Sequence, residues 1–375
     1  MKKIGIITLY DNINIGNKLQ NYAVQCFFSE MDYKCETIRH WEMAHKKLKW
    51  WVIKDKVIEI IGYPRKKAKI YRLKTKRKKI FSDFSKKHLT LGEEISIKSL
   101  PANFKKKYDY FVTGSDQVWH NWTNTEEEIN YFMLKFADAY QRITIAPSFG
   151  KSEVDSFFSN VYAEGLENIP FITCREEQGA NIVRELTGKE AQVILDPTML
   201  IDEGNWIEIE KKPVNFPDKG YILLYALGDV SNEVKGFLNK IAQDNNYLIV
   251  DIFNENIPEL YITAPDEFIY YVHHANLVVT DSFHACAFSI LFKTNFIVFN
   301  RKTTNMKDMT SRLDTLLQTF NLSKRKFGVL QESEIFETDF SGVSRKLERE
   351  RIRTRKIYSE NFKMLDALKS SLRND

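Results

Sequence analysis

The sequence predicts an α/β protein with two Rossmann-like domains facing a cleft. Apolar strand-like runs alternate with helical patterns along most of the chain, and 375 residues exceed what one hydrophobic core usually supports. The clearest linker comprises Lys211 to Pro213 and Phe216 to Gly220. We therefore expect an N-terminal domain at 1–212, a C-terminal domain at 213–340, and a helix at 341–375 that packs back on the first domain.

The first domain begins with the short apolar run Ile4 to Leu9, which polar residues follow at once. This pattern is typical of a buried first strand and not of a signal peptide, and no stretch approaches the ~20 apolar residues of a membrane-spanning helix. The other expected elements are helices at Lys18–Met31 and Glu177–Leu186, and strands at Cys35–Arg39, Tyr108–Thr113, Ile143–Ala146 and Gln192–Leu195.

A second cycle of elements follows the linker. Its expected segments are Tyr221–Leu227, Val234–Ala242, Tyr247–Phe253, Glu267–Ala275, Leu277–Thr280, Phe288–Phe292 and Phe296–Phe299. Alternation of this kind predicts parallel sheets with helices on both faces. The charged stretch Arg345 to Leu372 has few helix breakers and reads as a long helix.

A basic helical insertion is expected at 46–100. Between residues 46 and 87 there are 17 Lys or Arg against three acids, and the aromatic pair Trp50-Trp51 lies among aliphatic residues. Lysines combined with an apolar face are typical of an interfacial helix, so peripheral docking on an anionic membrane is the preferred interpretation. A solvated helix, a protein interface and a nucleic-acid surface are the alternatives. Nucleic acid is the least favoured, because no recognised binding module accompanies the charge.

Cysteine and histidine spacing predicts no metal site. Four cysteines without metal-like spacing suit a reducing cytoplasm. Adjacent His273 and His274 are not read as a metal motif, because neighbouring side chains diverge on a helix. Cys286 is read as a small buried residue in preference to a nucleophile.

The segment Thr280 to Ile290 predicts a functional site. Its polar residues Asp281, Ser282 and His284 follow a strand-like run and precede a helical pattern that starts at Phe283. They should therefore lie at the carboxyl end of a strand, beside a helix N-terminus that favours a phosphate or carboxylate. The alternative is that Asp281 and Ser282 only cap the helix.

A series of motifs resembles the polysaccharide pyruvyl transferase family. Each is weak alone, but together, in this order over about three hundred residues, they are specific. The matching segments are Gly16 to Ala23, Gly114 to Trp119, Ser148 to Gly150, Arg175 to Glu177, Asp196 to Thr198, Thr280 to His284, and Ser311 to Leu313.

This resemblance implies a GT-B-like fold and transfer of the pyruvyl group of phosphoenolpyruvate to two hydroxyls of a sugar, forming a cyclic ketal. Phosphoenolpyruvate is the donor substrate and no cofactor is expected. The family's acceptors are commonly lipid-linked saccharides of capsule, exopolysaccharide or cell-wall polymer assembly. A cytoplasmic enzyme, peripheral on the inner face of the cell membrane, is therefore expected.

The resemblance also assigns roles. His284 matches the family's functional histidine, and Arg175 matches an arginine that contacts the donor, although Arg175 could instead be an ordinary ion-paired residue. Asp116 is expected to activate the sugar hydroxyl or to orient a base, with a turn aspartate as the alternative. Asp281 is expected to orient His284 or to cap the helix. The expected substrate-binding residues are Arg175, Ser282, Phe283, Gly16, Asn17, Gln20, Ser115, Arg301 and Arg312.

Several positions depart from the family pattern. In part of the family an Arg stands where this chain has Ser282, so the positive charge must come from elsewhere or the ligand is recognised differently. Ile15, His120, Ala285 and Asn295 also differ from common family residues. Two other functions stay open: a nucleotide-sugar glycosyltransferase on the same fold, and a non-catalytic saccharide-binding protein of envelope assembly.

Overall fold

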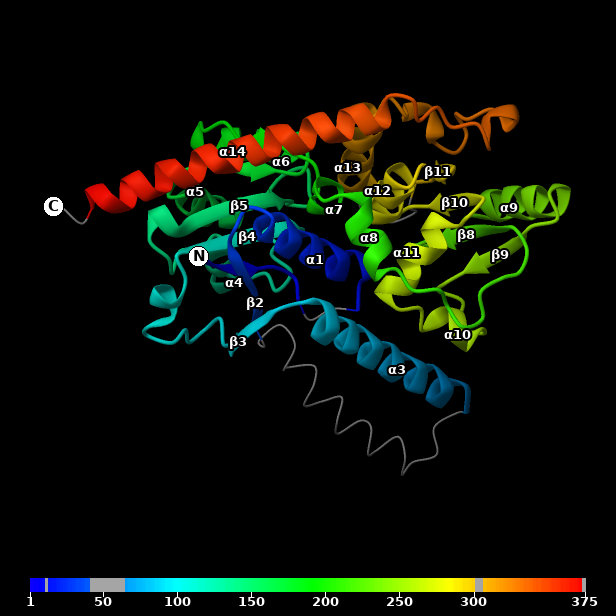
Figure 1. The fold of residues 1–375 in the computed structure, drawn as a ribbon, viewed down its shortest axis with the longest axis horizontal. Helices are drawn as coiled ribbons and strands as arrows, with labels where there is room; N and C mark the ends of the chain where they lie inside the picture. The colour runs from blue at the N-terminus through cyan, green and yellow to red at the C-terminus, as the bar shows by residue number, and fades with distance from the viewer. Residues whose placement is uncertain (11–12, 41–64, 301–305, 373–375) are drawn as a thin grey trace. The chain divides into compact units, whose positions relative to one another are not determined.

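The computed structural model describes residues 1–10, 13–40, 65–300 and 306–372, with two units of the chain each built around a parallel sheet. Unit 1 comprises 1–63, 85–201 and 349–375, and unit 2 comprises 64–84 and 202–348. The predicted α/β class with two parallel-sheet units is confirmed (Figure 1). Most of the aromatic part of the predicted insertion, including Trp50 and Trp51, lies outside the described residues.

Unit 1 has a five-stranded sheet in the order β3-β2-β1-β4-β5, and all its pairs are parallel. A separate pair, β6 and β7, is also parallel. The strands are β1 (Lys3–Ile7), β2 (Lys34–His40), β3 (Leu91–Ile95), β4 (Tyr110–Asp116), β5 (Arg142–Pro147), β6 (Thr173–Cys174) and β7 (Gln192–Val193). The helices are α1 (Ile15–Ser29), α4 (Glu126–Phe132), α5 (Ser159–Glu167), α6 (Glu177–Thr187) and α7 (Pro197–Leu200), with short 3-10 turns at Phe104–Lys107, Ala139–Gln141 and Ser156–Phe158.

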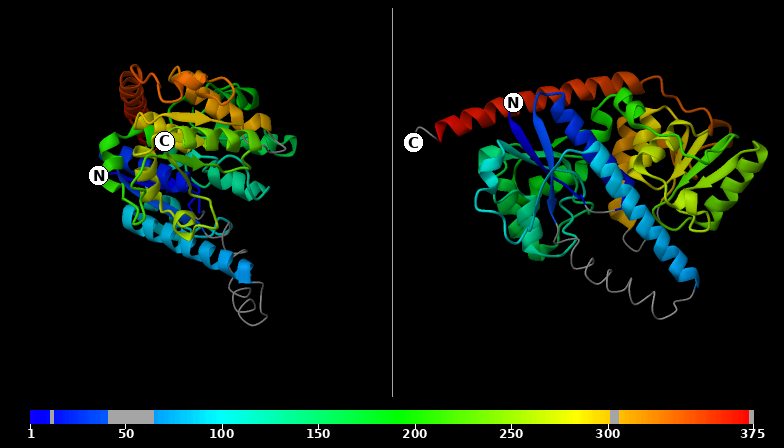
Figure 2. Two further views of the ribbon diagram at one scale, coloured as in Figure 1. Left: turned by 90° about the vertical axis from the view of Figure 1, so that its right-hand side faces the viewer. Right: turned by 60° about the horizontal axis from the view of Figure 1, so that its bottom comes forward.

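Side chains of β4 alternate between two apolar layers. Tyr110 contacts Phe362 of α14 (Val343–Ser371), whereas Phe111 contacts Phe104 and Phe136 on the other face. Tyr358 of α14 packs edge-on against Phe27 of α1, and the two helices lie together in Figure 2. Alternation with a period of two thus gives one helical layer on each face of the unit 1 sheet.

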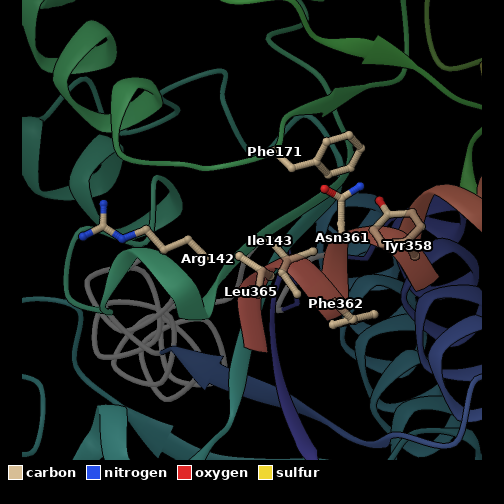
Figure 3. A pocket seen from close by; sticks show the side chains of 7 residues that line it. All are labelled: Arg142, Ile143, Phe171, Tyr358, Asn361, Phe362 and Leu365. Carbon is tan, nitrogen blue, oxygen red and sulfur yellow. The ribbon is translucent and has the colours of Figure 1, made fainter. Parts of the chain in front are cut away.

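A small hollow remains beside α14 in unit 1. It measures about 10 Å³ and lies among Ile143, Phe171 and apolar residues of α14, including Tyr358 and Leu365 (Figure 3). That is room for about one water molecule. The contact between α14 and the sheet is therefore close-packed and offers no substrate site.

Unit 2 has a four-stranded parallel sheet in the order β11-β10-β8-β9. Its strands are β8 (Tyr221–Tyr225), β9 (Leu248–Asp251), β10 (Leu277–Thr280) and β11 (Phe296–Val298). Its helices are α8 (Glu203–Ile209), α9 (Asn232–Asp244), α10 (Pro258–Tyr261), α11 (Pro265–His273), α12 (Phe283–Leu291) and α13 (Met306–Thr319), with 3-10 turns at Ser323–Arg325 and Glu332–Glu334. Helix α3 (Arg65–His88) contributes residues 65–84 to this unit and its last turn to unit 1.

Local sequence explains where the site-bearing elements begin and end. Helix α1 starts at Ile15, three residues before the predicted start, because the Asn14 side chain accepts a hydrogen bond from Asn17 N and caps it. Strand β4 continues to Asp116, beyond the predicted end, through Gly114 at φ 122°. A Cβ at Gly114 would lie 2.2 Å from the Ile145 carbonyl oxygen, so only glycine fits there.

Candidate functional site

Each of the two larger sheets has one point where the strand order reverses. In unit 1 it lies between β1 and β4, because β2 and β3 extend one side of β1 and β4 starts the other. In unit 2 it lies between β8 and β10. Ligands of open parallel sheets bind at the carboxyl ends of the strands at such a point. Predicted site residues lie at both places.

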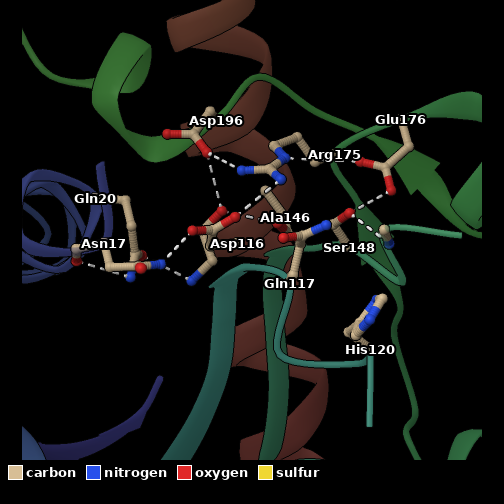
Figure 4. A network of polar contacts seen from close by, with 12 residues as sticks. Asn17, Gln20, Asp116, Gln117, His120, Ala146, Ser148, Arg175, Glu176 and Asp196 are labelled. Carbon is tan, nitrogen blue, oxygen red and sulfur yellow. Dashed lines mark hydrogen bonds and ion pairs between the residues drawn. The ribbon is translucent and has the colours of Figure 1, made fainter. Parts of the chain in front are cut away.

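In unit 1, a buried polar cluster contains Asn17, Asp116, Arg175 and Asp196, called here the Asp116 cluster (Figure 4). Asn17 Nδ2 donates to Asp116 Oδ2. Arg175 donates from one amino group to Asp116 Oδ1 at 3.1 Å and from the other to Asp196 Oδ2 at 3.0 Å. Three predicted residues from three distant segments are thus brought together, and Asp196 joins them.

The topology explains why these residues meet. Asp116 ends β4, Arg175 follows β6, and Asn17 lies in the first turn of α1 after β1. Because β1 and β4 are neighbouring parallel strands, their carboxyl ends lie at one edge. Arg175 follows a strand of the separate pair, and its N–H donates to the Pro147 carbonyl oxygen at the end of β5 at 3.2 Å. Asp116 has φ 67°, a left-handed conformation that is uncommon outside glycine and that persists where the surroundings fix it.

The Arg175 side chain is 1% exposed and lies among carboxylates. Burial lowers the pKa of its guanidinium, but the charges of Asp116, Asp196 and Glu176 outweigh burial, so the net pKa is raised. Glu176 Oε2 lies 3.6 Å from Arg175 Nε, and Glu176 Oε1 accepts from Ser148 Oγ at 2.6 Å. This is the ion-paired arrangement of the alternative interpretation; the donor contact of Arg175 stays a prediction.

Neutral groups fix the same edge. Gln20 Oε1 accepts from Ser115 N at 3.0 Å, and Gln20 Nε2 donates to Thr8 Oγ1 at 2.7 Å. Ser115 Oγ lies 2.8 Å from the Ala146 carbonyl oxygen and 3.1 Å from Asp196 Oδ2. Gln20 and Ser115 are fully buried. The geometry gives both a supporting position beneath the Asp116 cluster.

In unit 2, α12 begins where the sequence predicts, directly after Ser282. Ser282 is its N-cap, with Oγ at 3.5 Å from Ala285 N, and its own N–H donates to Thr280 Oγ1 at 2.9 Å. His284 lies in the first turn, 8% exposed, with its ring edge-on to Phe283. The positive end of the helix dipole favours an anion at this position.

Asp281 has two backbone partners that the sequence did not predict, while its expected role in orienting His284 stays a prediction. Its Oδ1 accepts from Leu227 N at 2.7 Å and its Oδ2 from Gly228 N at 2.9 Å. Both groups belong to the loop after β8, the strand beside β10. The helix-capping role belongs to Ser282, and Asp281 holds the β8 loop at the switch point.

Four further residues singled out in the sequence have different surroundings. Gly16 is buried in the first turn of α1. Arg312 is 7% exposed on α13. Arg301 lies outside the described residues. Cys286 is fully buried, which raises the pKa of its thiol and suits the expected packing role.

Sequence reasoning missed Arg77. This α3 residue is 2% exposed, donates to the Tyr261 carbonyl oxygen, and places its guanidinium 5.1 to 5.2 Å from the ring centroids of Phe81, Phe253 and Tyr261. Burial lowers its pKa. In the part of the chain that the structure describes, no carboxylate forms an ion pair with it. The signal was its place in the stripe Leu73, Arg77, Phe81 and Phe84, but one Arg among many lysines looked like surface charge.

The prediction that the side chains of His273 and His274 diverge is wrong. The ring centroids of His273 and His274 lie 4.6 Å apart at 36°, and both rings point to Glu210. Helix α11 ends at His273, and His274 at φ −102° and ψ 6° has left the helical conformation. Adjacent side chains diverge only while the helix continues.

A family model for polysaccharide pyruvyl transferase matches residues 14–303. No curated protein matches the chain at a significant level. Similar solved structures include the UDP-GlcNAc 2-epimerase of Neisseria meningitidis bound to UDP-GlcNAc, at 10% identity, covering 94% of this chain and 93% of that one, with a TM-score of 0.46. The S. aureus MnaA structure with UDP shares 11% identity and covers 96% and 98%, with a TM-score of 0.43. The glycotransferase of kitacinnamycin shares 9% identity and covers 96% and 98%, with a TM-score of 0.42.

Proposed function

The chain belongs to the polysaccharide pyruvyl transferase family, and from that premise we propose that this transferase moves the pyruvyl group of phosphoenolpyruvate onto two hydroxyls of one sugar. The product is a cyclic ketal and inorganic phosphate. The two sugar hydroxyls lose two protons. One proton is added to the donor's methylene carbon, which becomes a methyl group, and the other leaves with the phosphate. The observation that carries the proposal is the family match over residues 14–303. Polar motifs of the matched segment lie at the switch points of the two larger sheets.

The donor requires a site for a phosphate and a carboxylate. The first turn of α12 supports this role, because it presents backbone N–H groups beside Ser282 and His284. His284 is the proposed acid for the methylene carbon or a ligand of the leaving phosphate. Asp281 acts through the loop at Leu227 and Gly228, which it holds beside the start of α12.

The acceptor hydroxyl requires a base. Asp116 is the proposed group, since it lies 7% exposed at the end of β4 with one oxygen toward Arg175 and the other toward Asn17. Arg175 then acts as a positioning residue that orients the Asp116 carboxylate. The lone pairs that these two contacts leave free are available to a sugar hydroxyl.

A lipid-linked acceptor and peripheral membrane contact are also proposed. Helix α3 buries Leu73, Arg77, Phe81 and Phe84 on one side and exposes Lys69, Arg72, Lys74, Lys76, Lys78 and Lys79 on the other. Such a face attracts anionic headgroups and diphosphates. Among the described residues, no helix is both long and apolar enough to span a bilayer.

Ligand-induced thermal stabilisation tests the donor. Phosphoenolpyruvate should stabilise the protein by about 2.7 kcal/mol at a hundredfold excess over its Kd. Ser282→Asp keeps a good N-cap but adds a negative charge at the anion site, so the shift should be lost. Ser282→Asn keeps the cap without the charge and should retain it. Stabilisation by a UDP-sugar and none by phosphoenolpyruvate would instead establish a nucleotide-sugar glycosyltransferase.

A further inference from the structure

We propose that Glu210, His273 and His274 form a binding site for a divalent transition-metal ion, with Zn²⁺ the best match. The three residues come from two separate segments of unit 2. Glu210 follows the last residue of α8, His273 ends α11, and His274 is the C-cap of α11. The site is separate from the Asp116 cluster and from the α12 N-terminus, and it does not depend on the proposed reaction.

The donor atoms converge. His273 Nδ1 lies 3.0 Å from Glu210 Oε2, and His274 Nε2 lies 3.9 Å from Glu210 Oε1. One ligand atom from each residue lies within 4.8 Å of the other two. Zinc binds nitrogen and carboxylate oxygen at about 2.0–2.2 Å, so its ligand atoms lie roughly 3.3 Å apart in a tetrahedral site. The two observed separations, 3.0 and 3.9 Å, lie on either side of that value.

Flat ring contacts hold both imidazoles in place. The His273 ring stacks on Phe292 at 4.3 Å and 17°, and the His274 ring lies against Tyr270 at 4.1 Å and 34°. These contacts involve the ring faces and leave the nitrogen edges directed at Glu210. Metal sites depend on such outer contacts to orient their ligands.

Accessibility and donor chemistry favour a zinc-like ion. The side chains of His273, His274 and Glu210 are 28%, 41% and 12% exposed, so an ion can enter and a water can complete its coordination. Two imidazoles and one carboxylate suit Zn²⁺, whereas Mg²⁺ and Ca²⁺ prefer oxygen ligands alone.

The structure also indicates what the ion would do. Glu210 begins the segment 210–220 that joins α8 to β8. This segment already contacts α11 through Lys211, whose N–H donates to the Asp266 carbonyl oxygen at 3.1 Å and whose Nζ pairs with Glu267 at 2.8 Å. A metal at Glu210 would tie the segment to the other end of α11. Zinc is therefore expected to stabilise unit 2.

The competing explanation is a metal-free hydrogen-bonded trio in which Glu210 accepts from the two imidazoles. The positive charge of Lys212 also acts on His274 and opposes an added cation. That explanation predicts no stoichiometric zinc and no stabilisation by it.

The test uses the full chain, stripped of metal by a chelator and dialysed. Zinc and magnesium are titrated at pH 7.5, with calorimetry for affinity, elemental analysis for content and thermal unfolding for stability. We expect one Zn²⁺ per chain, a higher Tm with zinc and no change with magnesium. Glu210→Gln and His274→Asn should each weaken zinc binding roughly tenfold or more. Glu208→Gln, an exposed carboxylate on α8, is the matched control and should bind like the wild type.

The His274 side chain is 41% exposed, so its variant should fold, and its far-UV spectrum checks this. With Co²⁺ in place of zinc, the wild type should show the visible absorption of a low-coordinate site and His274→Asn should not. Substoichiometric zinc in the wild type, or equal affinity in Glu210→Gln, His274→Asn and Glu208→Gln, would overturn the proposal.

Discussion

At the residue scale, substitutions of Asp116 and Arg175 have different predicted consequences. Asp116 is proposed to contact the acceptor, whereas Arg175 acts through Asp116. Asp116→Asn keeps the shape and the hydrogen bond to Arg175 but removes the base. We expect kcat for phosphate release to fall roughly 10² to 10⁴-fold with little change in KM for phosphoenolpyruvate. Unchanged turnover would exclude Asp116 as the base.

Arg175→Met tests the buried ion cluster. Removing the guanidinium leaves Asp116 and Asp196 as buried carboxylates without their cation. Breaking a buried pair in this way costs about 3–5 kcal/mol of the free energy of unfolding, which urea denaturation measures. Arg353→Met, at an exposed arginine of α14, is the control and should change stability by less than about 1 kcal/mol. An equally small loss in the free energy of unfolding in both variants would contradict a stabilising role for the Asp116 cluster.

His40 predicts an acid-dependent loss of stability. It is buried at the end of β2 against Tyr131 and Phe132, and burial lowers its pKa to about 4 from 6.5. Between these values the unfolded chain binds a proton that the folded chain excludes. Stability is therefore lost as the pH falls from about 6.5 to about 4, by roughly 3 kcal/mol, and is not lost further below. His40→Leu should remove this part of the pH dependence in urea titrations at pH 7, 5.5 and 4.5; parallel curves for both proteins would contradict it.

At the element scale, α3 has two distinct faces that can be tested separately. Its exposed lysines are predicted to bind anionic membrane, whereas Arg77 anchors the opposite face in an aromatic cage. A triple Lys74→Gln, Lys76→Gln, Lys78→Gln variant should bind phosphatidylserine vesicles roughly a hundredfold more weakly, at about 1 kcal/mol per lysine.

The controls for α3 are neutral phosphatidylcholine vesicles, which should bind neither protein, and thermal unfolding, which should be unchanged. High salt should weaken wild-type binding in the same way as the triple substitution. Equal sedimentation of both proteins with anionic vesicles would show that the helix face is only solvated.

The central strands and their flanking helices were predictable because they form apolar runs or have apolar residues at helical spacing, whereas β3, with the sequence LGEEI and one buried residue, has no such pattern and was not predicted. Helix α6 and strand β4 begin within two residues of their predicted starts. A predicted boundary was wrong where a single side chain sets it, as Asn14 does for the start of α1. The side chain of Asp281 could not be placed, because its partners, Leu227 and Gly228, lie more than fifty residues earlier in the chain.

At the scale of the whole molecule, the sequence predicted the α/β class and the family but not the full composition of the polar clusters. Asp196 stood in a recognised motif, yet only the fold shows its bond to Arg175. Arg77 and the pair His273–His274 were misjudged, since burial and helix ends depend on distant packing. Local patterns specify elements and edges, while contacts between distant segments require the folded chain.

The central claim is that the chain makes a pyruvate ketal from phosphoenolpyruvate. The most direct measurement is mass spectrometry of lipid-linked saccharides, extracted from the organism that encodes the chain and incubated with the protein and phosphoenolpyruvate labelled with ¹³C. A saccharide that gains labelled pyruvate less one water, with one phosphate released per saccharide and no gain with Asp116→Asn, is the predicted result. No labelled saccharide with phosphoenolpyruvate, together with sugar transfer from a nucleotide sugar by the same preparation, would contradict the account.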